Sequence, residues 1–291
     1  MIKEFEYFAP RKLDEAINLL SKYKDDCKII AGGQTLLILM RQGLVAPRYV
    51  VDIKGISSLD YINLDGGKGI NIGALTTHRT IEKSTIIRDS FNVLAEMERK
   101  LATVETRSWG TIGGNIAHAD PAGDVLPVLI ALNATIKVVG PGGERTIPAE
   151  EFGKGYFETA LLQDEILTEI QLQNPKPRTG TIYEKFTMIE GDYAMASVRV
   201  SITTDATGKN CDDIRIVLGA VAPSPIRAKG SEKVLTGKAI TEDLLEEAGK
   251  AASEEAKPVS DMHASDEYKR QLIKVLVKRI VPKALEIARK A

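Results

Sequence analysis

The stretch Ala31-Gly32-Gly33-Gln34-Thr35 decides how the N-terminal part of this sequence is expected to fold. Two consecutive glycines let backbone N–H groups point into one concavity, because no Cβ atom obstructs them. Such a nest at the start of a helix suits an anion. The motif is neither G-x-G-x-x-G nor a phosphate-binding loop that ends in G-K-[ST]. Taken alone, the stretch is explained equally well as a plain tight turn.

The residues around this stretch predict a small α/β unit. Strands are expected at residues 5–8, 28–31 and 49–53, and helices over residues 13–23 and 36–41. The order is therefore strand, glycine turn, helix and strand. This is the context in which a glycine turn can hold a phosphate group.

A second glycine pair lies in Thr111-Ile112-Gly113-Gly114-Asn115. Two glycine turns with neighbouring Thr and Asn side chains can hold one diphosphate from two sides. The alternative for this loop is a hairpin turn followed by a capped helix. Asp124 can accept hydrogen bonds from ribityl or ribose hydroxyls, or it can cap a helix, and the two roles can coexist. Trp109 is expected to pack under the loop.

The rest of the chain predicts a hairpin, a helical stretch, and then strands followed by helices, which is typical of an α+β arrangement. The C-terminal helix carries an apolar stripe that is expected to pack on a sheet. The remaining elements are expected at residues 62–74 (hairpin), 92–101 and 124–132 (helices), 135–139, 182–186, 197–203 and 213–221 (strands), and 227–235, 241–254 and 266–288 (helices).

Composition excludes several classes of function. The chain has 291 residues and a net charge of -1, so it has no basic excess for binding nucleic acid. The longest apolar run, residues 125–139, is interrupted by Pro127, Asn133 and Lys137 and is too short for a membrane span. The N-terminus has no apolar signal core, so a cytoplasmic location is expected.

The cysteines and histidines do not have the spacing of a metal site. Cys27 and Cys211 cannot ligate an iron–sulfur cluster or zinc by themselves, and they are expected to be buried thiols. His78, His118 and His263 form no ligand motif, so no metal is expected. No serine-nucleophile motif occurs either. Any redox group must then be organic or be held elsewhere.

Several motifs, in this order along the whole chain, resemble the FAD-binding medium subunit of the molybdenum hydroxylases, the carbon monoxide dehydrogenase and xanthine dehydrogenase family. Each motif is moderately specific, and their joint occurrence in register carries the resemblance. The motifs are AGGQTLLILMRQG, VVDIKGISSLDYI, INIGALTTH, TIGGNIAHADPAGDVLPVLIAL, GERTIPAEEF and GAVAPSPIRA.

The resemblance implies an α+β fold with FAD in a crevice between two domains. Residues 1–175 are expected to form an FAD-binding domain of the vanillyl-alcohol-oxidase (PCMH) type, with subdomains of about 1–55 and 56–175. Residues 178–291 are expected to form a C-terminal domain like that of the carbon monoxide dehydrogenase flavoprotein, with an antiparallel sheet and helices. The stretch Asn174-Pro175-Lys176-Pro177-Arg178-Thr179-Gly180 favours a boundary there.

The resemblance also assigns residues to FAD and none to catalysis. The glycine loops are expected to hold the diphosphate, Ile166 and Leu167 to lie beside the adenine half, and Lys185 and Tyr193 to approach from the C-terminal domain. The alternative for Tyr193 is packing in a core. The complete expected set is Lys28, Ile30, Ala31, Gly32, Gly33, Gln34, Thr35, Leu36, Leu101, Ala102, Thr111, Gly113, Gly114, Asn115, Ala117, Gly123, Asp124, Ile166, Leu167, Lys185 and Tyr193.

The sequence departs from the family pattern at two places. Many relatives carry an arginine shortly after the strand with the lysine, whereas Phe186-Thr187-Met188-Ile189-Glu190 has none. Relatives also often carry I-R-N before the second loop, and of these Thr106-Arg107-Ser108-Trp109-Gly110 keeps only the arginine. The chain also lacks the cysteines for the inserted cluster of the subgroup that resembles 4-hydroxybenzoyl-CoA reductase.

The function implied by the resemblance is that of an FAD-dependent oxidoreductase subunit, active as part of a complex. A large subunit with molybdopterin would oxidise the substrate, and a small subunit with [2Fe–2S] centres would pass electrons to this subunit's FAD and on to an external acceptor. The assembly implied is a dimer of heterotrimers. Neither the substrate nor the acceptor (NAD, a quinone, ferredoxin or oxygen) follows from the sequence.

Two other functions remain open at this point. One is a stand-alone flavoprotein oxidoreductase of related fold, which would turn over a small substrate unaided. The other is a non-catalytic binding module in which the glycine turns are purely structural. The absence of a nucleophile or an acid–base pair in the motifs favours a subunit whose cofactor does the chemistry.

Overall fold

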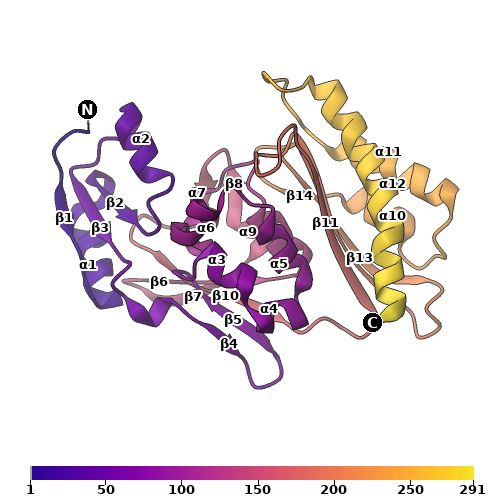
Figure 1. Ribbon diagram of the computed structural model, residues 1–291, viewed down its shortest axis with the longest axis horizontal. Helices are drawn as coiled ribbons and strands as arrows, with labels where there is room; N and C mark the ends of the chain where they lie inside the picture. The colour runs from indigo at the N-terminus through magenta and orange to yellow at the C-terminus, as the bar shows by residue number, and fades with distance from the viewer. Residues whose placement is uncertain (1) are drawn as a thin grey trace.

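A computed structural model describes residues 2–291 and arranges the main sheets of the chain in a row (Figure 1). The first sheet is parallel, in the order β1-β3-β2, and consists of β1 (Glu6–Phe8), β2 (Cys27–Ile30) and β3 (Tyr49–Asp52). The helices α1 (Leu13–Tyr23) and α2 (Leu36–Gln42) connect these strands. The expected α/β unit is confirmed, and α1 buries the apolar face that its sequence predicts.

The middle sheet is antiparallel and has the order β4-β5-β10-β6-β7. Its strands are β4 (Ile62–Leu64), β5 (Gly69–Gly73), β6 (Thr135–Gly140), β7 (Gly143–Pro148) and β10 (Ile166–Gln173). One apolar core joins this sheet to the helices between its strands. The remaining elements of this region are α3 (His78–Lys83), α4 (Thr85–Ser90), α5 (Asn92–Arg99), α6 (Val104–Trp109), α7 (Ile112–His118), α8 (Val125–Ala131), α9 (Ala149–Phe152), β8 (Gly153–Gly155) and β9 (Glu158–Thr159).

The C-terminal region is an antiparallel sheet covered on its outer face by helices (Figure 1). The long helix α12 packs on β11, β12 and α11, which confirms the expected apolar stripe. The fold is therefore the expected α+β fold. Along the chain, the small parallel sheet with its helices comes first, the five-stranded sheet with its helices second, and the C-terminal antiparallel sheet with its helices last. The elements are β11 (Thr179–Phe186), β12 (Ala196–Thr204), β13 (Cys211–Gly219), β14 (Ile226–Arg227), α10 (Lys229–Leu235), α11 (Glu242–Glu255) and α12 (Asp266–Lys290).

The sequence missed some short elements. The helices α3, α4 and α6 have six residues each, which is too short for a clear helical period. The expected helix start at residue 227 was wrong, because Arg227 pairs with Val217 in β14. Both cysteines are free and buried, as expected.

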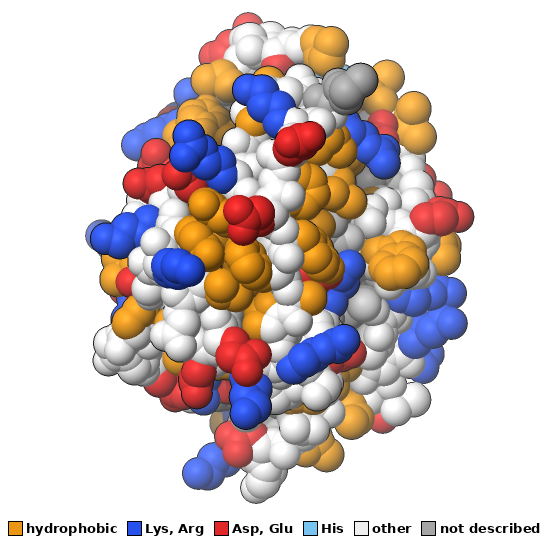
Figure 2. Space-filling view, turned by 90° about the vertical axis from the view of Figure 1, so that its left-hand side faces the viewer, with side chains coloured by type: hydrophobic (Ala, Val, Ile, Leu, Met, Phe, Trp, Pro, Cys, Tyr) orange, Lys and Arg blue, Asp and Glu red, His pale blue; other side chains and the backbone are white. Residues whose placement is uncertain are grey.

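The N-terminal end of the molecule exposes several apolar side chains. Figure 2 looks onto this end, where apolar groups gather near the centre between scattered charged ones. On and beside α2, the side chains of Leu37, Ile38 and Leu44 are exposed. Within residues 2–291, no helix combines the length and apolar character needed to cross a bilayer, and no cluster of three or more His, Cys, Asp or Glu side chains is arranged for a metal.

Candidate cofactor site

The two glycine loops, distant in sequence, lie against each other. An ideal Cβ atom on Gly32 would overlap the carbonyl oxygen of Trp109 and would stand 2.7 Å from the Cα atom of Gly110. An ideal Cβ on Gly114 would stand 3.8 Å from the Cβ of Ala31. The structure therefore brings the two loops together at one place, as expected. The Trp109 side chain itself is exposed, so the expectation that it packs under the loop was wrong.

The first loop presents unused backbone donors. Gly33 has φ 71°, in the left-handed region that favours glycine. Within the described chain, the N–H groups of residues 32–35 donate no hydrogen bond to a protein acceptor, and the Gln34 amide turns back to the carbonyl of Gly32 at 3.2 Å. Buried or half-buried N–H groups are rarely left unpaired without a bound partner or water. The loop is thus a nest of donors that fits an anion.

The second glycine pair forms the first turn of α7 and is not a hairpin turn. Thr111 is the N-cap, and its hydroxyl accepts a hydrogen bond from the Gly114 N–H at 3.2 Å. Gly113 has a packing role, because an ideal Cβ there would stand 2.6 Å from the Cβ of Ala74, and its N–H donates to the Ala74 carbonyl. Gly114 is exposed, and Asn115 is half-buried; its backbone N–H donates to the Thr111 carbonyl at 3.0 Å, whereas its side-chain amide bonds to no atom of residues 2–291. Asn115 is therefore free to bind a ligand.

Asp124 does not cap a helix, although it stands immediately before α8. Its side chain makes no cap hydrogen bond and is 5% exposed. The carboxylate instead accepts hydrogen bonds from Lys185 Nζ at 2.7 Å and from Arg199 Nη2 at 2.8 Å. A buried carboxylate needs such partners because burial removes its hydration. The cap interpretation was wrong, and sequence reasoning missed Arg199.

Lys185 on β11 lies against Asp124, and the loop after β11 that carries Tyr193 lies against Ala102. Besides Asp124, Lys185 Nζ binds the carbonyl of Asp192 at 2.9 Å, which holds the segment that carries Tyr193. An ideal Cβ on Gly191 would stand 3.1 Å from the carbonyl oxygen of Ala102. The Tyr193 side chain is 64% exposed. The alternative that Tyr193 packs in a core was therefore wrong.

Arg107, the arginine that this chain keeps before the second loop, supports the backbone beside Tyr193. Its guanidinium donates to the carbonyls of Leu101 at 2.7 Å and Ala102 at 3.1 Å, and to Glu82 at 3.0 Å. Ala102 has φ 44°, which is unusual for a residue other than glycine. Arg107 therefore holds a strained turn in place.

The other expected residues differ in their exposure. Ile166 and Leu167 start β10 with buried side chains, one packed in the N-terminal core and the other in the middle core. Ile30 is also buried, and Lys28 is exposed on β2. Where a side chain is buried in a core, the backbone is the part that can face a ligand. The remaining expected residues are Leu36 and Gly123, which are partly buried, and Ala117, which is exposed.

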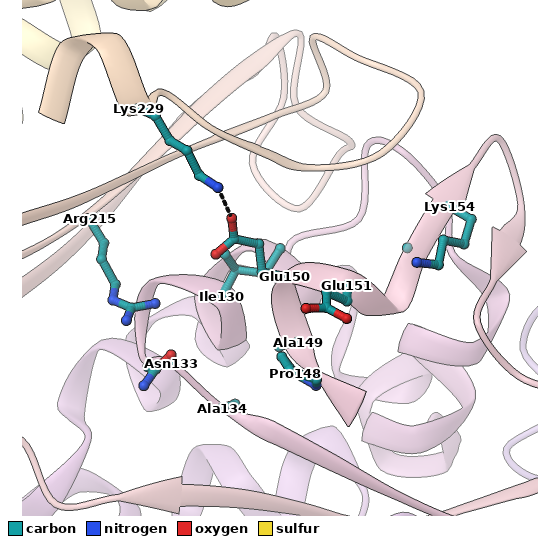
Figure 3. A pocket seen from close by; sticks show the side chains of 11 residues that line it. Ile130, Asn133, Ala134, Pro148, Ala149, Glu150, Glu151, Lys154, Arg215 and Lys229 are labelled. Atoms are coloured by element: carbon teal, nitrogen blue, oxygen red, sulfur yellow. Dashed lines mark ion pairs between the residues drawn. The ribbon is translucent and has the colours of Figure 1, made fainter. Parts of the chain in front are cut away.

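A cavity of about 480 Å³ lies away from these loops, beyond the other end of α8 (Figure 3). Its charged lining comes from Glu150, Glu151, Lys154, Arg215 and Lys229, and Lys229 pairs with Glu150 at 2.8 Å. None of the expected cofactor residues lines it. The glycine loops and this cavity are separate features.

Comparison with known proteins agrees with this arrangement. Residues 3–175 match the family described as "FAD binding domain in molybdopterin dehydrogenase". Residues 181–284 match the family described as "CO dehydrogenase flavoprotein C-terminal domain". Together these two matches cover most of the chain.

Similar proteins extend over nearly the whole length. The carbon monoxide dehydrogenase medium chain of Hydrogenophaga pseudoflava is 35% identical over 94% of this chain and 95% of its own length. The glyceraldehyde dehydrogenase medium chain of Sulfolobus acidocaldarius is 34% identical over 94% and 95%.

Solved structures show the same fold. A chain of carbon monoxide dehydrogenase from Hydrogenophaga pseudoflava superposes with a TM-score of 0.93 over 99% of this chain and 98% of that one, at 35% identity. Quinoline 2-oxidoreductase from Pseudomonas putida 86 gives 0.93 over 99% of both chains, at 31% identity. The chain therefore belongs to the family of FAD-binding medium subunits of the molybdenum hydroxylases.

Proposed function

We propose that the two glycine loops hold the diphosphate of FAD, and that the C-terminal sheet closes the site through Lys185 and Tyr193. The observation that carries this proposal is the set of unpaired N–H groups at residues 32–35, beside the second loop. Bound FAD supplies the redox chemistry, and the protein supplies binding, orientation and electrostatics.

The FAD-binding residues would be those expected from the sequence, with three roles revised. Gly113 allows close packing of α7 against the end of β5 instead of donating to phosphate. Ile166 and Leu167 would offer backbone rather than side chain to the adenine half. Asp124 would act with both carboxylate oxygens already held by cations.

In this proposal the chain works as one subunit among partners. A large subunit with molybdopterin would oxidise the substrate, a small subunit with [2Fe–2S] centres would deliver electrons here, and an external acceptor would remove them. Similar proteins named for carbon monoxide, glyceraldehyde and quinoline align over nearly the whole chain, which supports substrate choice by a partner. The exposed apolar side chains of Leu37, Ile38 and Leu44 support a subunit contact near the first loop.

The proposal also includes the architecture of the complex and of the chain. We infer a dimer of heterotrimers, an FAD-binding domain over residues 1–175 with subdomains of about 1–55 and 56–175, and a C-terminal domain over residues 178–291. Separate sheets and separate apolar cores support these divisions. The two free buried thiols support a cytoplasmic location.

The direct test is the absorbance spectrum of the purified full-length chain, followed by titration of FAD into protein freed of flavin. We expect flavin bands and saturable binding of one FAD per chain. Colourless protein that takes up no FAD would refute the proposal. Substrate turnover by the chain alone would favour the stand-alone oxidoreductase instead. Purification from the native source, with FAD, molybdenum and iron quantified, tests the partners.

A further inference from the structure

Arg199 is a charged residue that lies wholly inside the protein. It stands on β12, and its side chain is 1% exposed. Along this strand Val198, Val200 and Ile202 face the core under the C-terminal helices, so Arg199 points to the opposite face, toward the FAD-binding region. Removing a guanidinium from water is strongly unfavourable unless its partners compensate. Its partners therefore indicate why it is there.

The partners of Arg199 belong to both regions of the chain. Nη2 lies 2.8 Å from Asp124 Oδ1 and 3.4 Å from the Asp124 carbonyl, and Nη1 donates to Ser197 Oγ. The guanidinium carbon lies 4.7 Å from the centre of the Tyr183 ring, a cation–π contact. An ideal Cβ on Gly219 would stand 2.6 Å from Nη1, so the neighbouring strand leaves room for the guanidinium at that point. The geometry is specific to an arginine in this place.

Arg199 acts on the site through Asp124. Since Oδ1 of Asp124 is held by Arg199, Oδ2 is left to Lys185 Nζ at 2.7 Å, and Lys185 in turn holds the carbonyl of Asp192 next to Tyr193. The stretch Phe186-Thr187-Met188-Ile189-Glu190 contains no cation that could replace Arg199. These hydrogen bonds connect Arg199 on the buried strand β12, through Asp124 and Lys185, to the segment that carries Tyr193.

The same cluster carries an excess of positive charge. One carboxylate, Asp124, faces two cations, Lys185 and Arg199, and all three side chains are at most 6% exposed. Near the Tyr183 ring, Lys100 Nζ at 5.5 Å from the ring centre adds a positive charge and the buried Glu98 carboxylate adds a negative one, so the excess rests on Lys185 and Arg199 against Asp124. The carboxylate of Asp120 lies at a more exposed position, where water screens it more. In a desolvated setting such an excess favours added electrons on a neighbouring group.

We infer that Arg199 is a positioning residue of the FAD site: it orients Asp124, and through Asp124 the Lys185–Tyr193 segment, and its charge raises the midpoint potential of the bound flavin. This inference rests on the proposed function. Because the Arg199 side chain is 1% exposed and bonds to Asp124, its influence on the flavin would pass through Asp124 and through space.

The test compares Arg199→Met and Arg199→Lys with wild type in the full-length chain. FAD affinity is measured by titration of flavin-free protein, midpoint potential by spectroelectrochemistry, and stability by thermal unfolding. We expect Arg199→Met to weaken FAD binding about tenfold or more and to shift the potential to more negative values. Arg199→Lys keeps the charge and should retain the potential while recovering part of the affinity.

Arg227→Met is the matched control, because Arg227 also lies in the C-terminal sheet and pairs with two carboxylates, Glu150 and Glu232, away from Asp124. It should lower the unfolding temperature and leave affinity and potential unchanged. Should Arg199→Met fail to fold, Asp124→Asn carries the test, because it removes the negative charge and should shift the potential to more positive values. An unchanged potential in that variant would overturn the inference.

Two further outcomes separate this inference from the proposed function. A wild-type chain that takes up no FAD overturns the proposed function and the inference with it. A wild-type chain that binds FAD, together with an Arg199→Met variant that is less stable but has unchanged affinity and potential, overturns the inference alone. Arg199 would then serve only to join the two regions.

Discussion

Gly32 lies so close to the backbone of Trp109 that no side chain fits between them. An ideal Cβ on Gly32 would overlap the Trp109 carbonyl oxygen and would stand 2.7 Å from the Cα of Gly110. The opposing atoms belong to the backbone, so they cannot turn aside as the end of a flexible side chain would. This contact fixes the distance between the two loops proposed to hold the diphosphate.

Replacing Gly32 by alanine should therefore push the loops apart. We expect Gly32→Ala to lower the free energy of unfolding by about 1–3 kcal/mol, as overpacking does, and to weaken FAD binding. Urea denaturation and FAD titration measure the two effects. Gly142→Ala is the control, since nothing lies within 4 Å of its ideal Cβ. Wild-type affinity in Gly32→Ala would show that the spacing of the loops does not matter for FAD.

Arg107 and Arg79 offer a matched pair, because both bind the carboxylate of Glu82. Arg107 is 7% exposed and also holds the carbonyls of Leu101 and Ala102, whereas Arg79 is 31% exposed. Arg107→Met leaves the carbonyls of Leu101 and Ala102 without their partner and leaves Glu82 paired with Arg79 alone, so we expect a loss of about 2–3 kcal/mol in the free energy of unfolding. Arg79→Met should cost less than about 1 kcal/mol. Equal losses in urea denaturation would contradict this account.

Local patterns in the sequence predicted the first loop well. The glycine pair at Gly32 and Gly33 follows a short apolar strand and precedes a helix, so its neighbours alone define the setting. Asp124 was harder, because an aspartate before a helix looks like a cap whether or not it is buried. Its actual partners, Lys185 and Arg199, are 61 and 75 residues away along the chain, and contacts over such separations cannot be predicted from the local sequence.

The sequence around Arg199 predicts its strand but not its burial. In Ser197-Val198-Arg199-Val200-Ser201 the valines alternate with polar residues, which is typical of a strand with one face in a core. That pattern normally places an arginine in water. The structure instead covers this second face of the strand with the FAD-binding region, so tertiary packing turns a surface position into a buried one.

The phenol of Tyr193 should titrate at unusually high pH. Although the Tyr193 side chain as a whole is 64% exposed, its phenol is partly desolvated and lies beside the carboxylate of Asp120, and both effects raise the pKa of Tyr193 to about 12. Below the ordinary tyrosine pKa of about 10, the phenol is protonated in both the folded and the unfolded chain, and its contribution to stability is complete. Between pH 10 and about 12 the unfolded chain loses this proton first, so the free energy of unfolding falls over that range. Tyr193→Phe removes this loss, so its free energy of unfolding should fall less steeply than that of wild type between pH 10 and 12.

Urea denaturation at intervals from pH 9 to 12 measures the difference between the two chains. Tyr61 and Tyr183 also have raised pKa values, but they are common to both proteins and cancel in the comparison. Asp120→Asn is a second variant, which removes the negative charge beside the phenol and so lowers the folded-state pKa of Tyr193; the loss should still begin near pH 10 but should be smaller than in wild type. Parallel curves for wild type and Tyr193→Phe would place the hydroxyl in open solvent.

Binding at the first loop should stabilise the whole chain by an amount that grows with the logarithm of the ligand concentration. FAD at about 100 times its dissociation constant should raise the free energy of unfolding by about 2.7 kcal/mol, because the ligand binds only the folded state. FMN lacks the second phosphate and the adenosine half, so at the same concentration it should stabilise the chain less. The unpaired N–H groups of residues 32–35 are proposed to bind the diphosphate. Equal stabilisation by FAD and FMN would contradict that proposed contact.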